Sequence, residues 1–283
     1  MTLQPLSPLL IEPLVRTALL EDLGTAGDLT TDAIVDPALI DSAALVSRVP
    51  GVIAGLDVAT LAFRLVEPRL DIAPRHLDGD EIAAGEAIAT LRGPARGLLS
   101  AERTALNFLC HMSGIATATA SIVAAVRGHR ARIVCTRKTM PGLRAVEKYA
   151  VRAGGGSNHR FGLSDAVLIK DNHLAIAGGV RSAIERVRAR VGHLVKIEVE
   201  VETLAQLEEA LSVGVDAVLL DNMDPDALRR AVQLVDGRAV TEASGRITPA
   251  TAPAIAETGV DLISIGWITH SVPALDIGLD VET

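Results

Sequence analysis

Aromatic residues are scarce, with one Trp, one Tyr and three Phe in 283 residues. A core must therefore be built from Ala, Val, Leu and Ile, and stacking platforms for single-stranded nucleic acid are largely missing. Positive charge is also in deficit, because 27 Lys and Arg stand against 35 Asp and Glu, a net charge of −8. Nucleic-acid affinity comes mostly from neutralising phosphates, so the composition argues against a nucleic-acid partner and against a polyanion-binding module.

Cysteine and uninterrupted hydrophobic runs are scarce as well. Neither Cys110 nor Cys135 has the spacing of a zinc motif or of a disulfide framework, which favours a reducing compartment, and we expect a cytoplasmic protein. The apolar N-terminal stretch contains three prolines and two charged residues, unlike a signal peptide. The longest segment without charge lies between Arg103 and Arg127, and its polar residues predict a buried helix rather than a membrane span.

The pattern of apolar residues divides the chain into two parts. A helical segment at 9–23 and short β-like pieces between Gly and Pro indicate an N-terminal α+β sandwich domain over residues 1–106. A long helix follows, for which Ser100 is the candidate N-cap. Residues 107–269 then alternate short apolar strands with helical segments, which is typical of βα units. We expect the C-terminal segment 270–283 to pack with the first domain.

Six candidate parallel strands follow the long helix, at residues 132–136, 166–170, 194–201, 217–221, 239–243 and 262–266. They are apolar and end at polar residues or at glycine, which is typical of a barrel with its chemistry at the carboxyl ends of the strands. A complete barrel of this type has eight strands. The sequence therefore predicts an α/β fold with an incomplete (βα) barrel of about six parallel strands.

Positive charge is concentrated in one segment. Residues 127–170 carry ten Lys or Arg against two acids, a local charge of +8, while the remaining residues sum to −16. A solvated basic face would explain this concentration, and so would a pocket for a strongly anionic small molecule. A mixture of arginine and lysine suits a ligand that carries both carboxylate and phosphate. The basic candidates are Arg103, Arg137, Lys138, His159, Arg160 and Lys170.

Acidic candidates also lie at predicted strand ends. Glu200 and Asp221 are about one βα repeat apart and are expected at the same barrel mouth, and Glu198 shares the side of its strand with Glu200. Such carboxylates could hold ribose hydroxyls, bind Mg²⁺ or stabilise a developing cation, or they could form structural salt bridges.

Small residues follow the last two predicted strands. Ser244 and Gly245 come after one strand and Gly266 after the next. In a barrel, loops at this place often present backbone N–H groups to a phosphate. Outside a barrel, the Ser-Gly pair would mean only a turn.

These residues stand in segments that resemble quinolinate phosphoribosyltransferases. The similar segments span about residues 9–280 and are LEDLGTAGDLTTDAI, SAERTALNFLCHMSGIAT, TRKTMPGLRAVEKYAVRAGGGSNHRFGLSDAVLIKDNHL, KIEVEVE, AVLLDNM, TEASG and TGVDLISIGWITHS. The resemblance implies that quinolinate and 5-phosphoribosyl-1-pyrophosphate react, with Mg²⁺, to give nicotinate mononucleotide, pyrophosphate and CO₂ in NAD biosynthesis. It also implies a homodimer or a hexamer of dimers, in which one subunit's N-terminal domain covers its partner's barrel mouth.

The resemblance assigns roles position by position. The quinolinate-binding groups are Arg103 (reaching across the dimer), Arg137, His159, Arg160 and Lys170, and the 5′-phosphate loops contain Ser244, Gly245 and Gly266. The predicted catalytic residues are Lys138, Lys170, Glu200 and Asp221, and Glu200 and Asp221 are also the candidate Mg²⁺ ligands, partly through the substrate. Two residues depart from the family pattern, because Arg246 and Trp267 stand where smaller side chains are expected.

Two enzyme alternatives stay open. One is a related phosphoribosyltransferase-like protein with another acceptor, such as the homologue associated with molybdenum transport or a non-decarboxylating nicotinate enzyme. The other is a Schiff-base barrel lyase with Lys170 or Lys138 as nucleophile. The combined Arg137-Lys138, His159-Arg160 and 170–173 set favours a dicarboxylate acceptor.

Overall fold

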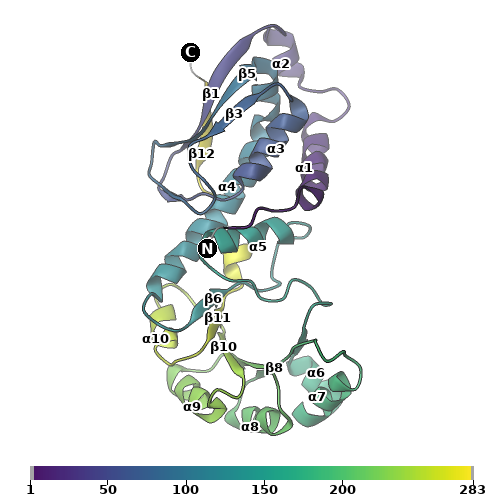
Figure 1. The fold of residues 1–283 in the computed structure, drawn as a ribbon, viewed down its shortest axis with the longest axis vertical. Coiled ribbons are helices and arrows are strands. Elements are labelled where there is room, and N and C mark those ends of the chain that lie inside the picture. Colours follow the sequence, from purple (N-terminus) through teal and green to yellow (C-terminus); the bar gives the residue numbers. More distant parts are fainter. Residues whose placement is uncertain (1–2, 282–283) are drawn as a thin grey trace. The chain divides into compact units, whose positions relative to one another are not determined.

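The computed structural model describes residues 3–281, which form two compact units. The first unit contains residues 3–120, 139–155 and 268–281, and the second contains residues 121–138 and 156–267. We call them the sandwich unit and the barrel unit (Figure 1).

A four-stranded antiparallel sheet with the order β12-β1-β5-β3 organises the sandwich unit. Its strands are β1 (Ile40–Ser47), β3 (Asp71–Pro74), β5 (Ala87–Pro94) and β12 (Ile277–Val281), and β2 (Gly51–Val52) pairs separately with β4 (Glu81–Ile82). Along β1, Ala43, Leu45 and Ser47 are buried at every second position, so one face of this strand turns to the core. The predicted sandwich is confirmed.

Helices complete the sandwich unit. They are α1 (Pro8–Leu23), α2 (Leu29–Ile34), α3 (Leu56–Val66), α5 (Arg144–Ala153) and most of α4 (Ala95–Ala125). By length and composition alone α4 could cross a membrane, but half of its most apolar 18-residue window is buried inside the protein. Within the unit, the Ala54 backbone N–H donates to the Ser113 hydroxyl on this helix at 3.0 Å. Both features fit the core helix of a globular unit.

The prediction that Ser100 caps this helix is wrong. The helix begins at Ala95, directly after Pro94 ends β5. The Ser100 hydroxyl instead donates to Asp28 Oδ2 at 3.0 Å, and the other oxygen of Asp28 accepts the Thr31 N–H at the start of α2. The apparent cap is thus a contact between segments far apart in the sequence.

Six parallel strands form the sheet of the barrel unit, in the order β6-β11-β10-β9-β8-β7. They are β6 (Arg132–Val134), β7 (Val167–Ile169), β8 (Ile197–Val201), β9 (Ala217–Asp221), β10 (Val240–Ser244) and β11 (Leu262–Ser264). The first and second strands along the chain, β6 and β7, form the two edges of the sheet, so the barrel is open between them. All six strands were predicted, and the incomplete barrel is confirmed.

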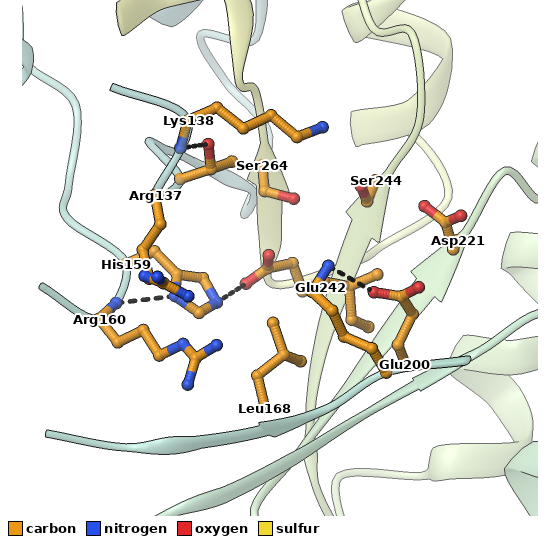
Figure 2. A pocket seen from close by; sticks show the side chains of 13 residues that line it. Arg137, Lys138, His159, Arg160, Leu168, Glu200, Asp221, Glu242, Ser244 and Ser264 are labelled. Carbon is orange, nitrogen blue, oxygen red and sulfur yellow. Dashed lines mark hydrogen bonds and ion pairs between the residues drawn. The ribbon is translucent and has the colours of Figure 1, made fainter. Parts of the chain in front are cut away.

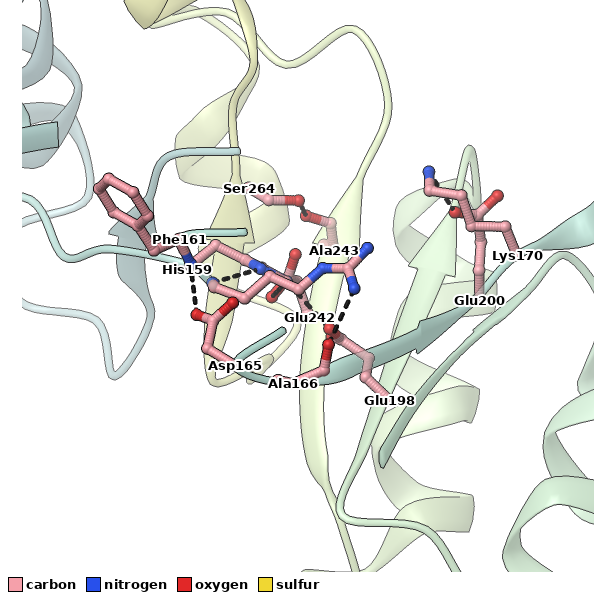
Figure 3. Close-up of polar contacts among 11 residues, drawn as sticks. His159, Phe161, Asp165, Ala166, Lys170, Glu198, Glu200, Glu242, Ala243 and Ser264 are labelled. Atoms are coloured by element: carbon pink, nitrogen blue, oxygen red, sulfur yellow. Dashed lines mark hydrogen bonds and ion pairs between the residues drawn. The ribbon is translucent and has the colours of Figure 1, made fainter. Parts of the chain in front are cut away.

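Helices cover the outside of the curved sheet (Figure 1). They are α6 (Asp171–Ala177), α7 (Val180–Arg188), α8 (Leu204–Val213), α9 (Pro225–Val235) and α10 (Ala252–Ala256), and the short 3₁₀ helix η1 (Trp267–Thr269) follows β11. The sequence IEVEV of β8 shows why the two faces differ. Val199 and Val201 are fully buried, and the alternating Glu198 and Glu200 turn to the opposite side, toward the barrel interior (Figure 3).

Candidate active site

A cavity of about 400 Å³ lies at the carboxyl ends of the barrel strands (Figure 2). It is lined by Thr136, Arg137, Lys138, His159, Arg160, Leu168, Lys170, Glu200, Leu219, Asp221, Glu242, Ser244 and Ser264. Eight of these residues are predicted site residues, drawn from the basic set, the acidic set and the first of the two small-residue loops. The strands thus bring most of the candidate set to one mouth, as a barrel does.

Cations gather on one side of the cavity. Arg137 and Lys138 follow β6, and Arg160 stands in the loop before β7, where its guanidinium donates to the Ala166 carbonyl at 2.9 Å. Burial lowers the pKa of Arg160, and the nearby charge of Arg137 lowers it further. Each guanidinium group disfavours the positive charge of the other, and an anion bound between them would stabilise both charges.

Carboxylates lie on the other side. Lys170 Nζ is 3.2 Å from Glu200 Oε2, and Asp221 accepts a hydrogen bond from the Asn222 amide at 2.6 Å. The Lys170 side chain is about half exposed, so its pairing with Glu200 is weakened by solvent. Glu200 and Asp221 end neighbouring strands of one sheet and present hard oxygen donors to the same cavity.

His159 links the cationic side to buried glutamates (Figure 3). Its Nδ1 accepts the Arg160 backbone N–H at 2.7 Å, so the ring hydrogen is on Nε2. That nitrogen is 2.9 Å from Glu198 Oε2 and 3.6 Å from Glu242 Oε2. The ring therefore faces the Arg160 backbone with Nδ1 and Glu198 with Nε2.

Glu242 is the most buried carboxyl group of the cavity. The residue is 1% exposed, and neither of its side-chain oxygens has a hydrogen-bond partner among the described residues. Burial and, second to it, the charge of Glu198 raise its pKa to about 7, and His159 and the nearby Ser264 hydroxyl oppose the rise. Near neutral pH this side chain is therefore partly protonated.

The atoms of His159, Glu198 and Glu242 that could bind a metal lie within 4.8 Å of one another. The hydrogen bonds disfavour a metal at this place. Because Nδ1 accepts an N–H, coordination through Nε2 would leave the ring with no hydrogen, as an imidazolate. A proton on Glu242 relieves the repulsion between the two carboxylates without that change.

Glycine is required after β10, and after β11 it leaves room for the Lys138 side chain. Gly245 has a φ of +120°, and a Cβ there would lie 2.3 Å from Asn222 Oδ1. A Cβ at Gly266 would lie 2.8 Å from Lys138 Cδ, so the loop after β11 runs directly beside a predicted catalytic residue. Arg246, where a smaller residue is expected, has a φ of +47°, in the left-handed region that favours glycine.

Trp267, the other departure from the family pattern, joins the two loops. Its indole Nε1 donates to the Ile247 carbonyl at 2.9 Å. Ile247 is buried and directly follows Arg246. The larger side chain therefore ties the loop after β11 to the loop after β10.

Arg103 does not line this cavity. It belongs to the sandwich unit, on α4, where its side chain is 64% exposed and lies 3.7 Å from Glu102. Its predicted role across a dimer stays a prediction.

Sequence reasoning left several lining residues out of its candidate set. They are Thr136, Leu168, Leu219, Glu242 and Ser264. Side-chain alternation could have found two of them, because Glu242 is two residues before Ser244 and Ser264 is two before Gly266. The same period of two places Glu198 on the same side of its strand as Glu200.

An open six-stranded barrel with a cation- and carboxylate-lined mouth, together with an antiparallel sandwich unit, defines the chain as a phosphoribosyltransferase of the incomplete-barrel class. Residues 28–113 match the N-terminal domain of quinolinate phosphoribosyl transferase, and residues 115–280 match its C-terminal domain. The chain belongs to the quinolinate phosphoribosyl transferase family.

Named relatives agree with this placement. A probable nicotinate-nucleotide pyrophosphorylase (carboxylating) of Bacillus subtilis is 45% identical over 271 residues, covering 96% of this chain and 93% of the relative. A nicotinate-nucleotide pyrophosphorylase (carboxylating) of Mycobacterium leprae is 48% identical over 272 residues, covering 94% and 95%. The structure of NadC from Streptococcus pyogenes has a TM-score of 0.94 and 41% identity, covering 99% of this chain and 100% of that one.

Proposed function

We propose that this protein transfers the phosphoribosyl group of 5-phosphoribosyl-1-pyrophosphate to quinolinate, with loss of CO₂, to give nicotinate mononucleotide for NAD biosynthesis. The observation that carries the proposal is that one cavity is lined both by four permanent cations and by the carboxylates of Glu200 and Asp221. The four cations are Arg137, Lys138, Arg160 and Lys170. Quinolinate is a dicarboxylate and the donor carries a phosphate and a pyrophosphate, so both substrates need this charge.

The carboxylates suit the first chemical step. When pyrophosphate leaves the donor, positive charge develops on the ribose ring, and a carboxylate fixed nearby lowers the energy of that state. Glu200 and Asp221 stand at the ends of adjacent strands and are positioned for this role or for the ribose hydroxyls. The pyridine nitrogen of quinolinate attacks the same carbon.

The second step is loss of the carboxylate next to the new bond. The ribosylated nitrogen is positively charged, and this charge stabilises the electron pair that remains on the ring carbon when CO₂ departs. No organic cofactor is needed, because the substrate itself supplies the electron sink. The arginines hold the remaining carboxylate in place.

Glu200 and Asp221 are also the residues that would hold Mg²⁺, partly through the donor's oxygens, since hard oxygen ligands are what this ion prefers. When bound, Mg²⁺ neutralises charge on the departing pyrophosphate. Addition of a chelator should abolish activity, and excess Mg²⁺ should restore it.

The acceptor distinguishes this function from its alternatives. Nicotinate lacks one carboxylate, and each lost charge-assisted contact costs about 1.5–3 kcal/mol, so we expect roughly tenfold to 150-fold lower kcat/KM than with quinolinate. The purified protein should form nicotinate mononucleotide from quinolinate, the phosphoribosyl donor and Mg²⁺. Equal efficiency with both acids contradicts the decarboxylating function, and borohydride trapping of Lys170 or Lys138 with substrate would instead reveal a Schiff-base lyase.

We further propose a cytoplasmic homodimer in which Arg103 serves the partner's cavity. The exposed position of Arg103 on α4, in a unit other than the one that holds the cavity, supports this role. Arg103→Ala and Lys138→Ala, each nearly inactive alone, should then recover about a quarter of wild-type activity after equal mixing and random subunit exchange, because half of the dimers are mixed and half of their sites are intact. Confirmed exchange without recovered activity contradicts the shared site.

A further inference from the structure

Glu242 is a buried acid, and the proposed function assigns it no role. It stands on β10, lines the cavity and points toward His159 (Figure 2). Its residue is 1% exposed and its two oxygens have no hydrogen-bond partner in the described part of the chain. Buried polar groups are normally hydrogen-bonded, so an unsatisfied carboxyl group at a cavity wall calls for a functional reason.

The surroundings of Glu242 favour a proton on it. Glu198 faces it from β8 and favours the proton, whereas His159 in the loop before β7 and the Ser264 hydroxyl on β11 oppose it. The Nε2–H of His159 is committed to Glu198, at 2.9 Å, and lies 3.6 Å from Glu242. A second buried carboxylate beside Glu198 would have to share this one histidine with it. Burial raises the pKa of Glu242 to about 7, which agrees with this geometry.

The reaction proposed above needs such an acid, and the present inference rests on that function. When CO₂ leaves ribosylated quinolinate, the electron pair of the broken carbon–carbon bond stays on carbon 2, in the plane of the pyridine ring. That carbon must gain a proton to become nicotinate mononucleotide. We propose that Glu242 is the catalytic acid that supplies it.

The proton balance is simple. The O–H bond of Glu242 breaks, a C–H bond forms at carbon 2, and Glu242 becomes a carboxylate. Solvent returns a proton to Glu242 before the next turnover. The neutral form has a second advantage, because it does not repel the dianionic acceptor when quinolinate enters.

Other groups that line the cavity are less suited to this step. Arg137 and Arg160 do not release protons near neutral pH. Lys170 is engaged by Glu200 at 3.2 Å and is a far weaker acid than a carboxylic acid. His159 donates its ring hydrogen to Glu198.

Single-turnover kinetics separate the two chemical steps. With enzyme in excess over quinolinate, pyrophosphate release reports ribosyl transfer and CO₂ release reports decarboxylation. We expect Glu242→Gln to release pyrophosphate within about threefold of the wild-type rate but CO₂ roughly 10²–10⁴-fold more slowly, with the dicarboxylated mononucleotide accumulating. Glu242→Asp keeps an acid at the site and should release CO₂ at least about tenfold faster than the Gln variant.

Two results would overturn the proposal: CO₂ release at the wild-type rate in Glu242→Gln, or equal slowing of both steps. A wild-type protein that forms no nicotinate mononucleotide contradicts the proposed function instead, so the two failures are distinguishable.

The pH profile tests the proposal without a variant at Glu242, in case that variant does not fold. In the wild type, CO₂ release should fall as pH rises through about 7, because the acid is lost. In Glu198→Gln the neighbouring negative charge is removed, so the same fall should move to lower pH. A profile that is flat in the wild type, or unmoved in Glu198→Gln, contradicts the role of Glu242.

Discussion

Each unit contains a histidine paired with a buried glutamate, and the two sites differ in how their carboxyl groups are hydrogen-bonded. In the sandwich unit, His111 Nε2 lies 3.0 Å from Glu147 Oε1, and Glu147 Oε2 accepts the Met140 backbone N–H at 3.1 Å. Glu147 is fully buried, and both of its oxygens are used by the protein itself. Such a pair fixes the position of the chain around it.

In the barrel unit, the hydrogen bonding of the carboxyl groups is less complete. His159 donates to Glu198 at 2.9 Å, but Glu242 beside them has two oxygens with no hydrogen-bond partner among residues 3–281. Burial alone does not separate the two sites, since Glu147 is 0% exposed and Glu242 is 1% exposed. What separates them is hydrogen-bond satisfaction, together with the cavity that Glu242 lines.

The largest effect on ribosyl transfer should come from removing the charged carboxylates at the barrel mouth. Glu200→Gln and Asp221→Asn should each lower kcat by roughly 10²–10³, the range seen when one electrostatic stabiliser is removed, while thermal unfolding changes little. Steady-state kinetics and melting curves of the same preparations check both statements. Near-normal kcat in both variants would mean that these carboxylates are structural groups, as Glu147 is.

A change at the His111–Glu147 pair of the sandwich unit should affect stability rather than catalysis. Glu147→Gln removes charge-assisted hydrogen bonds from a fully buried site and should lower the free energy of unfolding by about 1.5–3 kcal/mol, with kcat within about threefold of wild type. Denaturant unfolding measures this. Glu12→Gln is a matched control, because Glu12 pairs with Arg16 on an exposed face and the same substitution there should cost less than about 1 kcal/mol.

The sequence alone could predict the barrel strands and most of the site. Short apolar runs that end in polar residues or glycine mark parallel strands, and their carboxyl ends meet by the geometry of the fold. The His159, Glu198 and Glu242 cluster could not be predicted in this way. Its atoms come from a loop and two strands, and which glutamate receives the histidine's hydrogen depends on their positions in space.

Residue type also fails to predict local structure where a side chain bonds to a distant segment instead. Ser100 has the residue type of an N-cap, yet it bonds to Asp28 while α4 begins at Ala95. The Ser100 contact that decides this local structure lies outside any short window of sequence. Arg246 likewise has a left-handed backbone that its residue type disfavours.

The pH dependence of unfolding tests the contrast between the two pairs most directly. Folding raises the pKa of Glu242 from 4.5 to about 7, so its contribution to stability is present below about pH 4.5 and is lost as pH rises through 7. Glu242→Gln has no such group. Relative to wild type, this variant should therefore gain on the order of 3 kcal/mol between acidic and mildly alkaline pH.

The measurement is chemical denaturation of wild type, Glu242→Gln and Glu147→Gln at pH 5 and at pH 8. The account predicts that Glu242→Gln is more stable than wild type at pH 8 although it fails in decarboxylation, and that Glu147→Gln is less stable at both pH values although its kcat is retained. If Glu242→Gln is instead destabilised at pH 8 as Glu147→Gln is, Glu242 is a structural carboxylate and the distinction between the two pairs is wrong.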